Sequence, residues 1–140
     1  MKHGKKLVVV AIIGAALSSR TPAQNPHMTL QALDQLETGL WQIEEPGKAV
    51  RTMCLTDPTA LLQLAHAVPG CTRFVIANEA HSSTVHYSCN AAGWGRTTVR
   101  VATPRAVQID TQGIAAKAPF QFSADAHKVG SCPSAAAAPK

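Results

Sequence analysis

The chain has 140 residues, which is enough for one domain with a single modest hydrophobic core. Its net charge of +5 includes Lys2, Lys5 and Lys6, three lysines in a leading segment that we expect to be removed. Without them, ten basic residues stand against eight acidic ones, a net charge of +2. A net charge of +2 is too small to indicate nucleic-acid binding.

The leading segment has the features of a secretory signal peptide. After the lysines come eleven uncharged residues, 7–17, and then small residues at which cleavage can occur. We expect residues 1–18 to be a signal peptide, with cleavage after Ser18 or, alternatively, after Ala23. An uncleaved membrane anchor is disfavoured, because eleven helical residues reach about 16 Å across a hydrocarbon core about 30 Å thick. The sequence therefore predicts a periplasmic or secreted protein without a stable membrane span after processing.

The cysteines are four in number, Cys54, Cys71, Cys89 and Cys132. In an oxidising compartment an even number of cysteines predicts disulfides rather than a thiol or redox site. Three pairings are open, and the sequence alone does not choose among them. The connectors around the helix expected after Cys54 are long enough for a bridge across it, so we favour Cys54–Cys71 together with Cys89–Cys132.

That helix has clear start and stop signals. Asp57 can cap its first turn and Pro58 fits its first position, while Pro69 and Gly70 end it. An apolar stripe at helical spacing predicts that one side packs on a sheet. The stripe consists of Leu61, Leu64, Ala65 and Val68.

Most other segments alternate between apolar and polar residues, as β-strands do. Residues 39–45 and 49–55 predict a hairpin with Trp41 and Ile43 on one face, after a helical turn or two around Leu30, Leu33 and Leu36. Residues 73–77 are apolar enough for a central strand. Further strands are expected at 83–89, 96–102 and 107–111, and from Phe120 onward. The residues expected inward on them are Val85, Tyr87, Cys89, Thr97, Val99, Val101, Val107 and Ile109.

The expected fold class is α+β, an antiparallel β meander of about six or seven strands packed on one short helix and stabilised by disulfides. A single domain is expected over residues 33–132. It follows a flexible lead, 19–32, and precedes a disordered tail, 133–140, that is rich in alanine and proline.

One polar face of this meander is a candidate anion-binding site. His86, Arg96, Arg100 and Arg105 are expected to share it, and arginine binds carboxylate or phosphate with two parallel hydrogen bonds. The alternative is a solvated face whose arginines pair across strands with Asp110 and its neighbours. No histidine spacing indicates a metal site, and no glycine-rich or nucleophile motif is present. We therefore predict no catalytic residue, metal or cofactor.

Several of these features together resemble a bacterial family of small exported proteins known only as a domain of unknown function (number thirty-six-seventeen). They are the Leu-x-x-Gly-x-Trp pattern from Leu36 to Trp41, the cysteine-flanked helix, and the β meander that ends in a cysteine. The resemblance covers residues 33–132. It implies export, disulfides and a small α+β domain, and it implies no activity and no catalytic residues.

The expected function is that of an exported, non-enzymatic binding or envelope-associated module. Its partner would be an anionic envelope ligand or a protein, and not a nucleic acid. The alternative is a small periplasmic hydrolase or metal-dependent enzyme that uses His86 with nearby polar residues.

Overall fold

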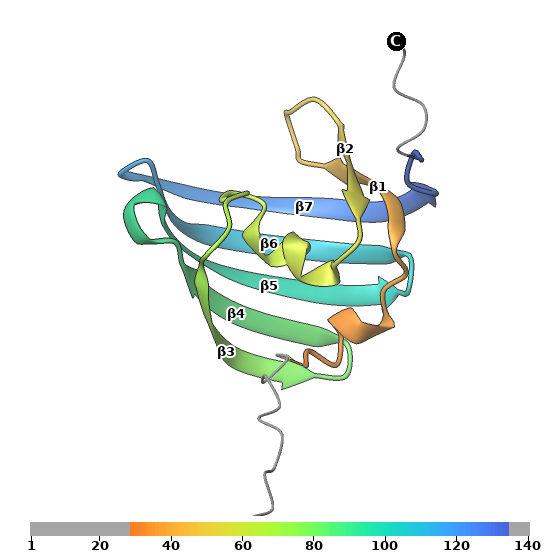
Figure 1. The fold of residues 1–140 in the computed structure, drawn as a ribbon, viewed down its shortest axis with the longest axis horizontal. Helices are drawn as coiled ribbons and strands as arrows, with labels where there is room; N and C mark the ends of the chain where they lie inside the picture. The colour runs from red at the N-terminus through yellow and green to blue at the C-terminus, as the bar shows by residue number, and fades with distance from the viewer. Residues whose placement is uncertain (1–28, 135–140) are drawn as a thin grey trace, which may run out of the picture.

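Seven antiparallel strands form one sheet in the order β2-β1-β7-β6-β5-β4-β3 (Figure 1). The structure is a computed structural model that describes residues 29–134. The expected signal peptide, residues 1–18, lies outside the described residues. The elements are η1 (Leu33–Gln35), β1 (Gly39–Glu44), β2 (Arg51–Leu55), η2 (Pro58–Gln63), β3 (Thr72–Glu79), β4 (Ser82–Ser88), η3 (Asn90–Ala92), β5 (Gly93–Thr103), β6 (Ala106–Ala115) and β7 (Ala118–Gly130).

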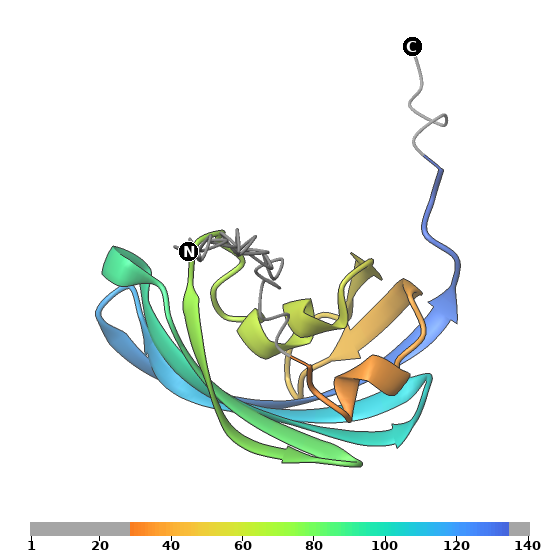
Figure 2. The same cartoon turned by 60° about the horizontal axis from the view of Figure 1, so that its bottom comes forward.

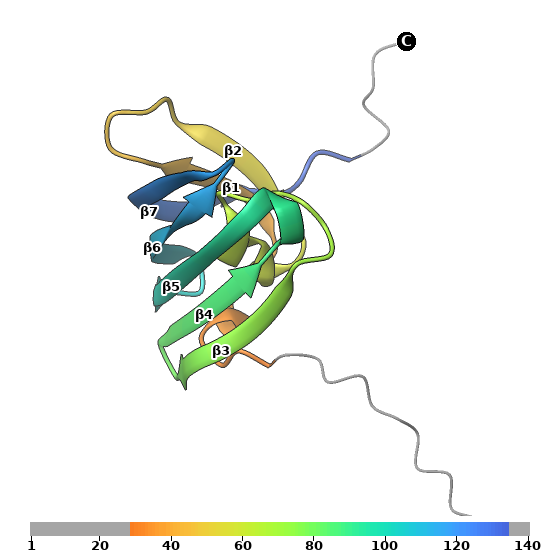
Figure 3. The same ribbon diagram turned by 90° about the vertical axis from the view of Figure 1, so that its left-hand side faces the viewer.

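The sheet is strongly curved, and the short helices η1 and η2 lie within its concave side (Figures 2 and 3). The hydrophobic core lies between them and the sheet, and it includes Trp41, Leu61, Val99 and Ile109, each at most 1% exposed. It extends to Leu30, ahead of η1. The described part of the chain is thus predominantly antiparallel β, stabilised by two disulfides. Its helices are short 3-10 helices, so the expected α+β class holds only roughly.

The helix after Cys54 begins as predicted and ends early. The Asp57 carboxylate accepts a hydrogen bond of 2.9 Å from the backbone N–H of Thr59, and Pro58 occupies the first position. The predicted helix to residue 68 is wrong, because η2 stops at Gln63 and the chain then turns toward β3. Leu61 is buried, but Val68, expected on the packed stripe, is 43% exposed.

The strand pattern is largely confirmed. β1 and β2 form the predicted hairpin, and every residue expected inward on β4, β5 and β6 is buried. The exception concerns residues 73–77, expected as a central strand. β3 is instead an edge strand that exposes 69% of Phe74 and 44% of Ile76. Only one face of β3 packs against the core. A continuous apolar run does not show whether a strand is central or at the edge of a sheet.

The favoured disulfide pairing is wrong. The bonds join Cys54 to Cys132 and Cys71 to Cys89. Leu40 of β1 pairs with Cys54 on one side and with Gly130 on the other, so the first bridge spans β1. The sequence separations are 78 and 18 residues. On the loop-entropy model they correspond to about 4.5 and 3 kcal/mol of stabilisation.

Candidate functional site

A pocket of about 520 Å³ opens between the β1–β2 hairpin and the chain from η2 to β3. Its volume is in the range of small-molecule sites. Apolar side chains, among them Ile43, Met53, Leu64 and Val68, supply much of its wall, and three basic side chains complete it. These three are Arg51, His66 and Arg73.

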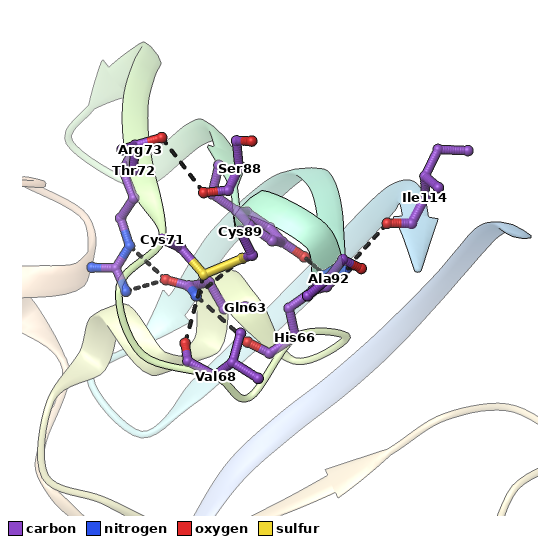
Figure 4. The surroundings of a disulfide bond; sticks show 11 residues. Gln63, His66, Val68, Cys71, Thr72, Arg73, Ser88, Cys89, Ala92 and Ile114 are labelled. Atoms are coloured by element: carbon purple, nitrogen blue, oxygen red, sulfur yellow. Dashed lines mark hydrogen bonds between the residues drawn. A yellow bond between two sulfur atoms is a disulfide. The ribbon is translucent and has the colours of Figure 1, made fainter. Parts of the chain in front are cut away.

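Arg73 projects from β3 toward η2, where its partners are neutral (Figure 4). Its Nε–H donates to the side-chain oxygen of Gln63 at 2.7 Å, and Nη2 contacts the same oxygen. Nη1 donates to the hydroxyl of Thr59 at 3.0 Å. Three of the five N–H donors of a guanidinium are thus used. Within the described residues this half-buried cation has no carboxylate partner. In contrast, three other arginines each form an ion pair with a carboxylate: Arg51, Arg100 and Arg105.

Arg51 differs from Arg73 because it has a carboxylate partner. Its Nη2 lies 2.9 Å from a carboxylate oxygen of Glu45, a buried residue that Lys48 also contacts. The two cations more than balance the single carboxylate of Glu45, and the cluster keeps a net charge of +1. The Lys48 ammonium also lies 5.0 Å from the ring centre of Phe122. This cluster therefore has a structural explanation that needs no ligand.

His66 fixes the pocket wall to the sheet. The buried imidazole has its Nε2 3.1 Å from the carbonyl oxygen of Ala92 and 3.0 Å from that of Ile114 (Figure 4). Because both carbonyls only accept hydrogen bonds, Nε2 carries a proton, and in the neutral imidazole Nδ1 accepts from the phenol of Tyr87 at 2.9 Å. Both ring nitrogens are thus engaged, which makes His66 an anchor rather than a free base.

Two further features hold this region in place. The disulfide between Cys71 and Cys89 ties the pocket wall to the end of β4 (Figure 4). Burial raises the pKa of the Tyr87 phenol, against a smaller opposing effect of its hydrogen bond with Thr111. Since Thr111 also contacts Thr97 at 2.8 Å, a buried polar chain runs from the pocket wall into the sheet.

The predicted anion-binding residues are only partly brought together. His86 and Arg96 are cross-strand neighbours on the convex face, and Arg100 lies on the same face of β5. Arg105 lies apart, at the turn between β5 and β6, with its Nε 3.8 Å from Glu37. Whether this face binds an anion stays a prediction.

Arg100 matches the alternative of cross-strand pairing, since it forms an ion pair with Asp110. The Ser123 hydroxyl, and then Arg100, hold the pKa of the Asp110 carboxyl below its usual value. Arg96 has no ion pair among the described residues. Of the predicted face, only Arg96 is a cation without a carboxylate partner in residues 29–134.

Over residues 29–134, no group of three or more His, Cys, Asp or Glu side chains has the arrangement of a metal site. In the same part of the chain, no helix combines the length and apolar character needed to cross a bilayer.

Comparison of the chain with family models, with curated proteins and with solved structures gave no match.

Sequence reasoning missed the pocket and Arg73. The contacts of Arg73 with Gln63 and Thr59 depend on η2 lying over β3, and no local pattern reports that. A weak signal was available: Arg73 is a single charge in an otherwise apolar run, and such a residue needs a specific partner when the strand packs.

Proposed function

We propose that the protein is an exported, non-enzymatic binding module. Its concave pocket takes a small ligand with an apolar body and one anionic group. The observation that carries this proposal is the half-buried guanidinium of Arg73, which has only neutral partners among the described residues and keeps two N–H donors free. A carboxylate or phosphate of the ligand would supply the missing charge, while the apolar wall would hold its body.

Export is part of this proposal, toward the periplasm or the outside of the cell. Two features support it: the two disulfides, which form in oxidising compartments, and the signal-like pattern of residues 1–18. Membership of the exported four-cysteine family also stays a proposal. On this basis the mature chain begins between Ser19 and Gln24, and an intact mass that retains Met1 would contradict export with cleavage.

The test compares two probes of equal chain length, dodecanoate and dodecanol, by calorimetry. We expect wild-type protein to bind dodecanoate about tenfold more tightly or better, because hydrogen bonds to a charged group contribute about 1.5–3 kcal/mol. Arg73→Gln should remove this preference and Arg73→Lys should keep part of it. Ala67→Trp, which fills the pocket, should abolish binding of both probes.

The matched control is Arg96→Gln, which removes a cation from the opposite face and should change neither affinity. Melting curves establish that each variant is folded. The proposal fails if wild-type protein binds neither probe, or if dodecanol binds as tightly as dodecanoate.

No observation favours the alternative of a small hydrolase or metal-dependent enzyme. His86 lies on the convex face with its ring against Trp94, at 5.4 Å between ring centres, and away from the concave pocket.

A further inference from the structure

A straight row of side chains crosses five strands on the convex face of the sheet. Phe74, His86, Arg96, Gln112 and Gln121 lie opposite one another in register, from β3 through β4, β5 and β6 to β7. With strands about 4.8 Å apart, the row is about 19 Å long. It lies outside the concave core and is open to a ligand that runs across the strands.

The row begins with aromatic rings. Phe74 is 69% exposed, and Trp94, the neighbour of Arg96 on the same face of β5, is 40% exposed. The ring of His86 lies against that of Trp94, with an angle of 31° between the planes. Single exposed rings are ordinary on protein surfaces, but here Phe74, His86 and Trp94 follow one another across neighbouring strands and form one aromatic group.

The row continues with unused hydrogen-bonding groups. The side chains of Arg96, Gln112 and Gln121 are exposed and make no hydrogen bond within the described residues, whereas Arg100 on the same face is paired with Asp110. Gln112 and Gln121 line two adjoining hollows of about 250 and 490 Å³. Arg96 borders the first hollow, as does the Asp110 carboxylate that Arg100 neutralises, and Trp94 borders the second. The face therefore offers two hollows and hydrogen-bonding groups that contact only solvent and are available to a ligand.

We infer that this row binds a linear acidic oligosaccharide. A sugar ring presents C–H groups on its face, which pack on aromatic rings, and hydroxyls on its rim, which both donate and accept hydrogen bonds as amides do. Arg96 can pair with a sugar carboxylate through two parallel hydrogen bonds. A single-stranded nucleic acid fits less well, because it needs a groove of cations along its backbone. Here the row carries one unpaired cation, Arg96.

The test uses calorimetry with three probes: oligogalacturonate, a neutral cello-oligosaccharide and oligodeoxythymidylate. We expect wild-type protein to bind oligogalacturonate most tightly, with an affinity that falls as salt is added. Trp94→Ala should weaken binding about tenfold, the effect of losing one aromatic contact. Arg96→Gln should remove the preference for the acidic over the neutral oligosaccharide.

The matched control is the double variant Arg100→Gln with Asp110→Asn, since it removes an ion pair from the same face and leaves the net charge of that face unchanged. It should change the affinity by less than about twofold, the effect expected of an exposed paired charge. Melting curves and intact disulfides show that each variant is folded. The inference is overturned if wild-type protein binds no oligosaccharide, if Trp94→Ala and the double variant of Arg100 and Asp110 behave alike, or if oligodeoxythymidylate binds most tightly. It is independent of the concave pocket, so Arg73→Gln should leave oligogalacturonate binding unchanged.

Discussion

The imidazole Nδ1 of His66 lies 2.9 Å from the phenolic oxygen of Tyr87, and this contact joins the pocket wall to the buried face of β4. Tyr87→Phe removes the phenol and leaves Nδ1 buried without a donor. We expect the free energy of unfolding to fall by about 1–2 kcal/mol, measured by urea denaturation. Ser88→Ala, at the exposed neighbouring position, should stay within about 0.5 kcal/mol. Equal effects of the two changes would show that the contact contributes nothing.

The same phenol predicts a loss of stability in alkali. Burial raises the pKa of Tyr87 above its usual 10.0, so the folded protein keeps the phenol proton at a pH where the unfolded chain loses it. Its contribution is therefore complete below about pH 10 and is lost as the pH rises through the folded-state pKa. Tyr87 is the only tyrosine, so its phenolate absorbance can be titrated directly.

Tyr87→Phe is also the control for this pH effect, because it lacks the titrating group and should lose less stability above about pH 10. A phenol that titrates at its usual pKa in the folded protein would refute the prediction.

Gly95 makes room for the Tyr87 ring. A Cβ atom at Gly95 would lie 2.4 Å from the phenolic oxygen and 2.5 Å from the adjacent ring carbon, and the ring is fully buried. We expect Gly95→Ala to cost about 1–3 kcal/mol of unfolding free energy. Gly130→Ala serves as the control, since its Cβ would meet nothing within 4 Å. A thermal melt that ranks the two variants equally would contradict this account of Gly95.

The two disulfides should differ in their effect on stability. Replacing Cys54 and Cys132 by serine should cost about 4.5 kcal/mol, and replacing Cys71 and Cys89 about 3 kcal/mol, because the first pair closes the longer loop. Denaturation curves of the two double variants measure the ranking. A digest of the unreduced wild-type protein checks the pairing itself, and a peptide linking Cys54 to Cys71 would be incompatible with the structure.

Local periodicity was sufficient to predict much of the sheet. The two-residue alternation around Trp41, Val85, Val99 and Ile109 gives the buried face of four strands, because a half-buried strand must alternate. The Asp57–Pro58 start of η2 was equally readable, since capping depends on neighbouring residues alone. The end of η2 was not, because it depends on contacts of the following residues with distant strands.

The disulfide pairing was within reach of the sequence once β3 and β4 are recognised as a hairpin. Thr72 pairs with Ser88, so the register places Cys71 opposite Cys89 just beyond the ladder. A bridge across a helix is a local guess, whereas strand register is a stronger constraint on which cysteines meet. Cys54 and Cys132 come together because β1 lies between β2 and β7. Reading each strand by its own pattern does not predict which strands are neighbours in the sheet.

Each disulfide attaches one edge of the sheet, its margin, to another part of the chain. Cys54 lies on β2 and Cys71 directly precedes β3, and these are the two outermost strands. Outer strands normally open first in local fluctuations, and an opened strand is where proteases cut and where foreign chains attach. In the oxidised protein each margin is tied at one end, so the ladder-bonded amide protons of β2 and β3 near the bridges should exchange more slowly than they do after reduction. Reduction would release both margins at once and leave β5, β6 and β7 as the last region to exchange.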